Sequence, residues 1–230
     1  MGSVRLTTRA AVALAAAAAI GLGAAMAIAG VTVYANKFAR KADVRELRHA
    51  EGKHCHRGWR RRAESLRVDV EKGPEVCGYR PPVEGDVDGP DHDLRAKEKL
   101  LRTTPKSVRR GAYVALAVRS DKSAGYELRV FPVKHRFELV RSPSGGGGGF
   151  PAKGTSSAIK GFRKPNVLRL RAVGDKVTAQ VNGKKVANVT DANPAQVGGR
   201  KLEVAIGHRR RSGKAVAATI DNLTVQVPNP

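Results

Sequence analysis

The stretch VTAQVNGKKVANVTD, residues Val177 to Asp191, decides the fold class. Every second residue of its first half is apolar, which is the pattern of a strand with one buried face. The dipeptide Asn182-Gly183 follows, and it favours the positive φ angles of a two-residue type I′ turn. The chain then returns through KKVANV. The stretch therefore predicts a hairpin of two antiparallel strands.

On both sides of this hairpin, further runs alternate apolar and polar residues and are separated by turn-forming Gly, Pro, Asn and Asp. No run has the period of a long helix, which parallel strands would need between them. The sequence predicts an all-β antiparallel β-sandwich, a jelly roll. The Gly-rich stretch SPSGGGGGFPAKGT is expected to be a loop. The alternating runs are DLRAKEKLL from Asp93, AYVALAVR from Ala112, GYELRVFPV from Gly125, HRFELVR from His135, NVLRLRAV from Asn166, LEVAIG from Leu202 and AVAATIDNLTVQV from Ala215.

The chain has an unusually large excess of basic residues. Its 230 residues carry 43 Lys and Arg against 20 Asp and Glu, a formal net charge of +23. Such an excess attracts polyanions: nucleic acid, anionic lipid headgroups or acidic polysaccharides. A base composition that enriches Arg and Ala accounts for it equally well. The chain has no helix-turn-helix, zinc-finger or aromatic RNA-binding pattern, so nucleic acid is not the expected partner.

The N-terminus carries an uncharged apolar run from Ala10 to Ala35, with basic residues on both sides. A run of about 20 apolar residues is long enough for a transmembrane helix. A secretory signal is the alternative, with cleavage after Ala27, Ala29 or Ala35, where small residues stand in the required positions. Both interpretations place the rest of the chain outside the cytoplasm, as a single-pass membrane protein or as a secreted one.

Two cysteines, Cys55 and Cys77, lie in one short region. In an exported protein an even number of cysteines predicts a disulfide. A metal site formed with the histidines beside Cys55 is the alternative, but zinc sites with two thiolates have more closely spaced cysteines. The chain is therefore divided into an anchor or signal at 1–35, a charged stalk and disulfide-stapled neck at 36–90, and the sandwich at 91–230.

The order of these strands resembles the concanavalin A-like lectin/glucanase superfamily, and within it the laminin-G-like and 3-keto-disaccharide-hydrolase-type jelly rolls. The matching parts are the asparagine before NVLRLRAV, the VNG hairpin and a last strand that carries IDN, over roughly Asp93 to Val227. The resemblance implies two antiparallel sheets packed face to face. It also implies a ligand on the concave face or in the rim loops, and it does not fix an activity.

No catalytic motif is found. The glucanases of that superfamily carry E-x-D-x-x-E on one strand, where paired carboxylates perform acid/base and nucleophilic chemistry, and this chain has no such strand. The nearest approach is the loop EGDVDGPDHD. Its alternating carboxylates are typical of a calcium site or of an acidic turn whose side chains cap the backbone. Calcium is the one cofactor considered, with four candidate ligands: Asp86, Asp88, Asp91 and Asp93.

The strand registers predict which side chains point away from the core. If those side chains share one sheet, they form a basic face whose guanidinium groups suit carboxylates, sulfates and phosphates. The simpler interpretation is the solvated face that an antiparallel sheet needs on one side. The predicted ligand-binding residues are Tyr113, Glu127, Arg129, Arg169, Arg171 and Gln180; Arg95, Lys97, Lys99 and Arg119 are expected beside them.

Three functions follow from these patterns. The first is an exported or membrane-anchored, non-catalytic module that binds glycans or anionic cell-envelope polymers, with the N-terminal helix in the membrane. The second is a glycoside hydrolase or lyase related to the 3-keto-disaccharide hydrolases, against which the missing carboxylate pair counts. The third is a structural or protein-interaction domain whose charge is incidental.

Overall fold

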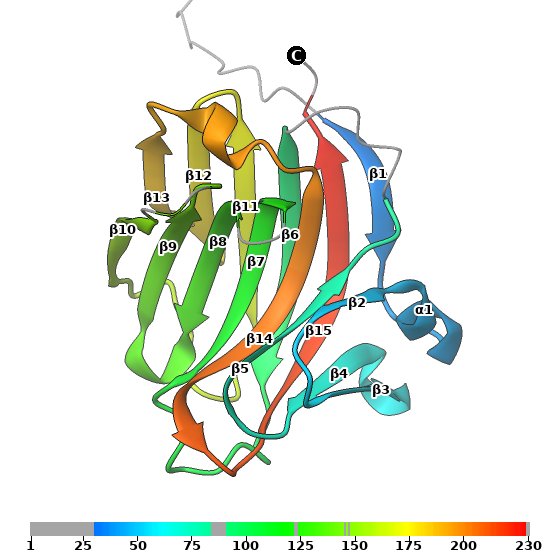
Figure 1. Ribbon diagram of the computed structural model, residues 1–230. Helices are drawn as coiled ribbons and strands as arrows, with labels where there is room; N and C mark the ends of the chain where they lie inside the picture. Colours follow the sequence, from blue (N-terminus) through cyan, green and yellow to red (C-terminus); the bar gives the residue numbers. More distant parts are fainter. Residues whose placement is uncertain (1–29, 84–90, 122–123, 145, 147, 229–230) are drawn as a thin grey trace, which may run out of the picture.

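The fold is an antiparallel β-sandwich, seen here in a computed structural model. It describes residues 30–83, 91–121, 124–144, 146 and 148–228, without the side chains of 210–212. Within these residues the strands form one sheet of eight and one of seven, packed face to face (Figure 1). The predicted all-β sandwich is confirmed. The predicted N-terminal helix falls mostly in residues 1–29, outside the described residues, and no helix within the described ranges is long and apolar enough to span a membrane.

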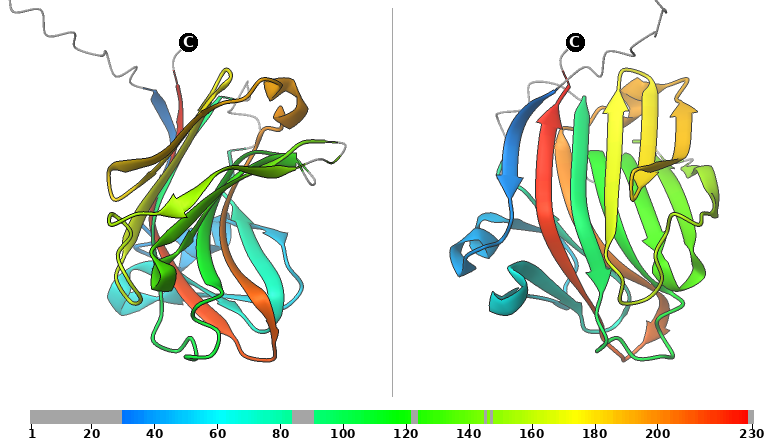
Figure 2. Two further views of the ribbon diagram at one scale, coloured as in Figure 1. Left: turned by 90° about the vertical axis from the view of Figure 1, so that its left-hand side faces the viewer. Right: turned by 180° about the vertical axis from the view of Figure 1, so that it is seen from behind.

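The eight-stranded sheet contains both ends of the described chain. Its strand order is β13-β12-β11-β6-β15-β4-β3, and β1 pairs with β15 beyond the end of β4. Figure 2 shows its outer side in the right-hand view. Its strands are β1 (Val31–Asn36), β3 (Cys55–Arg60), β4 (Ser65–Val70), β6 (His92–Leu100), β11 (Asn166–Val173), β12 (Lys176–Val181), β13 (Lys184–Thr190) and β15 (Val216–Val227).

The seven-stranded sheet has the order β10-β9-β8-β7-β14-β5-β2, and it faces the viewer in Figure 1. Its strands are β2 (Arg48–Glu51), β5 (Gly73–Arg80), β7 (Ala112–Asp121), β8 (Ala124–Phe131), β9 (Arg136–Ser142), β10 (Gly149–Thr155) and β14 (Lys201–Ser212). The described residues also contain a short helix, α1 (Lys41–Glu46), and three 3₁₀ turns at Arg61–Ala63, Pro132–Lys134 and Pro194–Val197.

The hairpin that decided the fold class is formed by β12 and β13. Asn182 and Gly183 have φ angles of 51° and 81°, as the predicted turn requires. Val177, Ala179 and Val181 are fully buried, so the predicted alternation gives the correct inward face. The Gly-rich stretch was expected to be a loop throughout. Its second half instead forms the edge strand β10, which pairs with β9 on one side only and has a register shift.

The core lies between the two sheets and is built mainly from Val, Leu, Ile and Ala. Strands on both sides of residue 90 contribute to it: Leu66, Val68 and Cys77 are as deeply buried as Leu94 and Leu168. The expected division into a neck at 36–90 and a sandwich at 91–230 thus does not coincide with the sheets, because residues 48–80 supply strands to both of them. β1 likewise takes up residues 31–35 of the expected anchor.

The predicted disulfide between Cys55 and Cys77 is confirmed. Cys55 lies on β3 of the eight-stranded sheet, and Cys77 on β5 of the seven-stranded sheet. The bond was expected to hold a poorly buried neck together. It joins the two layers of the sandwich instead, and Cys77 is fully buried.

Candidate functional site

The predicted ligand-binding residues lie on opposite sides of the molecule. Tyr113 on β7 and the pair Glu127 and Arg129 on β8 belong to the outer face of the seven-stranded sheet. The other three, Arg169 and Arg171 on β11 and Gln180 on β12, belong to the eight-stranded sheet. The core separates the two groups, so the single basic face considered from the sequence does not exist. Alternation identifies the outward residues of each strand, but it does not identify the sheet that a strand joins.

The outer face of the seven-stranded sheet has a floor of small residues across its centre. Ala115 on β7 pairs with Ala205 on β14, which pairs with Gly78 on β5. A Cβ on residue 78 would lie 2.8 Å from a carboxylate oxygen of Glu203 and 2.8 Å from the Cγ of Glu51, so these two side chains lie directly over Gly78. Neighbouring side chains cover Ala115 and Gly78, whereas Ala205 and the next outward residue of β7, Ala117, line a cavity with charged side chains at its margins.

Two ion pairs border this floor. Arg129 contacts Glu127 at 2.5 Å on β8, and Arg80 on β5 contacts Glu203 on β14 at 2.7 Å. Each guanidinium group neutralises its carboxylate, and the Glu203 carboxylate also accepts a hydrogen bond of 3.3 Å from the Ser120 hydroxyl. Together with Glu51 these side chains line a cavity of about 240 Å³.

Glu51, at the end of β2, completes a group of three carboxyl groups at the cavity. It pairs with Gly78 in the sheet, and its Oε1 lies 3.4 Å from the place that a Cβ on residue 78 would take, beside Glu203. Residue 51 is exposed to solvent. The protein atoms around its carboxyl group, and then the negative charges of Glu203 and Glu127, raise the pKa of Glu51 to about 7.

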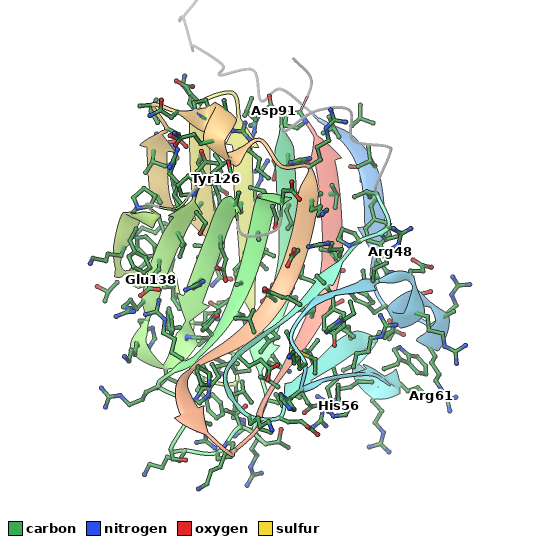
Figure 3. The ribbon with its side chains drawn as sticks, in the orientation of Figure 1. Arg48, His56, Arg61, Asp91, Tyr126 and Glu138 are labelled. Atoms are coloured by element: carbon green, nitrogen blue, oxygen red, sulfur yellow. A yellow bond between two sulfur atoms is a disulfide. The ribbon has the colours of Figure 1, made fainter. Side chains whose placement is uncertain are left out.

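A third carboxylate with arginine partners lies farther along the same face. Glu138 on β9 pairs with Arg136 and Arg209, with 3.0 Å between its Oε1 and the Nη1 of Arg209. Figure 3 labels Glu138 on the side of the sheet that faces the viewer. Arg209 also lies over the rings of Phe131 and Phe150, at 5.0 and 5.9 Å from their centroids.

Of the four predicted calcium ligands, Asp86 and Asp88 lie outside the described residues. Asp91 accepts a hydrogen bond of 2.7 Å from Arg119 and one of 3.0 Å from the backbone N–H of Gly174. Asp93 is nearly buried and pairs with Arg169. Asp91 and Asp93 thus have arginine partners, and no group of three metal-ligating side chains occurs among the residues described. Calcium binding stays a prediction.

Arg119, expected on the basic face, is buried instead. Its φ angle of 53° interrupts the alternation of β7 and turns the side chain toward the rim of the sandwich. There it donates to Asp91 and to the carbonyl of Gly174, both at 2.7 Å, and so ties the turn between β11 and β12 to β7. This contact joins the two sheets and gives Arg119 a structural role.

The sequence did not point to Glu51, Arg80 or Glu203 as site residues. Glu203 alternates with Leu202 and Val204, so its outward direction was readable from the run LEVAIG. Arg80 and Glu51 fall in the segment expected to be a neck. Their approach to Glu203 depends on β5 pairing with β14, and a contact over 123 residues of chain has no local signal.

Comparison with known proteins shows the fold. No protein-family model matches the chain, and no curated protein matches its sequence. Among solved structures, it is similar to the carbohydrate-binding module CBM66 from Bacillus subtilis, with a TM-score of 0.56 and 16% identity over 79% of this chain and 95% of that one.

A protein of unknown function with a galectin-like fold from Bacillus subtilis has a TM-score of 0.57 and 15% identity, over 87% of this chain and 98% of that one. The Crh5 transglycosylase in complex with NAG has a TM-score of 0.60 and 10% identity, over 86% and 84%. The chain therefore shares the sandwich of galectin-like, carbohydrate-binding and glycosidase-type jelly rolls, in agreement with the resemblance to the concanavalin A-like superfamily. At these identities the likeness concerns the fold alone.

Proposed function

We propose that the protein is a glycan-binding module whose ligand lies in the cavity on the outer face of the seven-stranded sheet. This proposal rests on two ion pairs, Arg80 with Glu203 and Arg129 with Glu127, which lie on either side of a floor of small residues. A sugar hydroxyl both donates and accepts hydrogen bonds. A guanidinium group beside a carboxylate offers it both partners at once.

The floor supports the same ligand class. Ala117, Ala205, Ala124 and Gly125 line the cavity and have no side chain long enough to fill it, so a sugar ring can enter between the charged margins. Similar folds include a carbohydrate-binding module and a transglycosylase solved with NAG, which supports a sugar as the ligand. Tyr113, Glu127 and Arg129 of the sequence prediction belong to this region or border it.

The test replaces one ion pair without removing its hydrogen-bonding groups. In the double variant Arg80→Gln/Glu203→Gln the cavity loses both charges together, so no unpaired charge is left behind. We expect at least tenfold weaker binding in a glycan array and in calorimetry. The matched control is Lys97→Gln/Asp221→Asn, an ion pair of 2.7 Å on the other sheet, which should bind as the wild type does. Equal affinities of the two double variants would contradict the proposed site.

A glycosidase is the second candidate, and Glu51 is the observation that favours it. A carboxyl group with a pKa of about 7 beside the arginine-paired Glu203 provides an acid and a base in one cavity. These carboxyl groups come from different strands and not from one E-x-D-x-x-E strand. Release of reducing sugar that is lost in Glu51→Gln, with glycan binding retained, would establish this activity. Binding without turnover would leave the module non-catalytic.

We also propose that the sandwich acts outside the cytoplasm. The apolar run from Ala10 and the disulfide between Cys55 and Cys77 support export, either on a membrane anchor or after signal cleavage. The full chain is then expected in the membrane fraction if residues 1–29 are retained. Recovery of the full chain with a reduced Cys55 and Cys77 from a reducing compartment would contradict export.

A further inference from the structure

The outer face of the eight-stranded sheet carries a row of cations that the proposed glycan site does not use. Lys185 on β13 pairs with Gln180 on β12, Gln180 with Arg169 on β11, and Arg169 with Arg95 on β6. The row therefore crosses four neighbouring strands at right angles to their direction. In the right-hand view of Figure 2 these strands face the viewer.

A second row runs beside the first on the same strands. It consists of Asn188, Thr178, Arg171 and Asp93, and Thr178 donates a hydrogen bond of 2.9 Å to the side chain of Asn188. Between the two rows lies a hollow of about 210 Å³. Its lining combines three cations with two neutral hydrogen-bonding groups: Arg169, Arg171, Lys185, Thr178 and Gln180.

Most of the cations in these two rows have no carboxylate partner among the described residues. Asp93 is the one carboxylate in the two rows. Arg169 already binds it, because its Nε–H is shared between the two carboxylate oxygens at 2.8 and 3.0 Å and its Nη2 donates to one of them as well. Arg95, Arg171 and Lys185 have no carboxylate within 4.0 Å in the described part of the chain. Because these cations repel one another, an anionic ligand lowers the energy of the face when it binds.

We propose that this face binds a linear acidic polysaccharide through its carboxylate groups, independently of the cavity on the opposite sheet. Guanidinium groups pair with carboxylates through two parallel hydrogen bonds, and Arg171 is available for such a pair. The hydroxyl and amide groups of Thr178 and Gln180 alternate with the cations, which suits a polymer whose hydroxyls alternate with its carboxylates. The two faces together allow one molecule to bridge a glycan and an acidic polymer.

Two other polyanions fit the face less well. Single-stranded nucleic acid is bound by stacking of its bases on aromatic side chains, and β6, β11, β12 and β13 carry no Phe, Tyr or Trp. A membrane surface is bound by basic residues together with inserted apolar side chains. The exposed large hydrophobic side chains of the described residues are Val31, at the far end of this sheet, and Phe150, on the other sheet.

The test uses polygalacturonate and its methyl ester as a matched charged and neutral polymer. The site variant is Arg171→Gln/Lys185→Gln, because neither residue has a carboxylate partner among the described residues that the substitution would leave unpaired. The control variant is Arg62→Gln/Lys106→Gln, which removes the same charges from exposed positions away from the hollow. All are tested as full-length proteins by calorimetry and by affinity electrophoresis.

We expect the wild type and the control to bind polygalacturonate equally and the site variant to bind at least tenfold more weakly. The methyl ester should not bind at this face. The variant Arg80→Gln/Glu203→Gln should retain polygalacturonate binding, so failure of the glycan site and failure of this face are distinguished. If the site and control variants lose the same affinity for polygalacturonate, the binding depends on net charge alone and the proposal is overturned. Preference for DNA or for phosphatidylglycerol vesicles, lost in the site variant, would also overturn it.

Discussion

Two asparagines fasten the loop before β11 to the hairpin that follows it. Asn182 donates hydrogen bonds to the carbonyl of Ala158 at 2.7 Å and to the side chain of Asn166 at 2.8 Å, and it accepts one from the N–H of Val167 at 2.9 Å. Asn166 in turn bonds the backbone of Lys160 in both directions. The sequence predicted the turn conformation of Asn182. Its side-chain partners were not predictable, because the loop has no regular period.

Replacing Asn182 separates its two roles. The variant Asn182→Gly keeps the freedom to adopt a positive φ but loses the three hydrogen bonds, which should cost about 1–2 kcal/mol of unfolding free energy. The variant Asn182→Ala loses the same bonds and also strains the turn, which should cost about 1 kcal/mol more. Urea unfolding of both variants measures the difference. Equal stabilities would mean that the positive φ imposes no strain at this position.

The buried carboxyl group of Glu98 makes stability depend on pH. It lies on the inward face of β6, and burial raises its pKa well above the ordinary value. The unfolded chain therefore loses this proton at lower pH than the folded protein does. The contribution of Glu98 to stability is greatest below the unfolded pKa and is lost as pH rises toward the folded pKa.

The variant Glu98→Gln has no proton to lose. Its stability relative to the wild type should increase with pH above the ordinary glutamate pKa, by up to about 1.4 kcal/mol per pH unit in that window. Urea unfolding at pH 4, 6 and 8 tests this. A difference between the two proteins that does not change with pH would show that the folded pKa is not raised.

At the scale of elements, alternation predicted the strands with a clear period of two and missed β1, β2, β3, β5 and β10. β7, β8, β11 and β12 have clear periods of two and appear where expected. β2, β3 and β5 are short or rich in Gly and charge. β5 takes its place through long-range pairing with β14, β2 then pairs with β5, and β3 pairs with the strand that follows it, β4. β1 was assigned to the anchor because VTVYA continues an apolar run. The predicted ligand-binding residues lie on two opposite faces for a related reason. Local sequence does not encode the sheet that a strand joins.

β1 gives an element-scale prediction. A chain that begins at Asn36 lacks its pairing with β15, which spans Val31 to Asn36, and the packing of Val33 and Tyr34 on the core. We expect it to be about 2 kcal/mol less stable than a chain that begins at Gly30. It should also self-associate through the exposed edge of β15. Thermal unfolding and light scattering compare the two chains, and equal midpoints would contradict a stabilising role for β1.

At the scale of the whole molecule, the two outer faces are built on different principles. The seven-stranded sheet presents arginines that are paired with Glu127, Glu138 and Glu203. The eight-stranded sheet presents Arg95 and Arg171, which have no such partner in the part of the chain that the structure describes. The net charge of the chain therefore says little about either face, because pairing and not composition decides where positive charge is available.

The disulfide between Cys55 and Cys77 gives a prediction for the whole sandwich. It closes a loop with a sequence separation of 22 and links the two sheets. Because the bond restricts the unfolded chain, the variant Cys55→Ala/Cys77→Ala should lose about 3 kcal/mol of unfolding free energy. The reduced wild type should lose a similar amount in urea unfolding. A reduced protein as stable as the oxidised one would contradict this role.

The place where the chain enters the sandwich also has a mechanical consequence. β1 starts beside the C-terminal end of β15 and runs antiparallel to it along the edge of the sheet (Figure 1). A pull on residue 30 along the axis of β1 loads all the hydrogen bonds between the two strands in shear, so they must fail together. A pull across the sheet would open them one at a time. Force applied along this axis thus meets the sandwich in its more resistant direction.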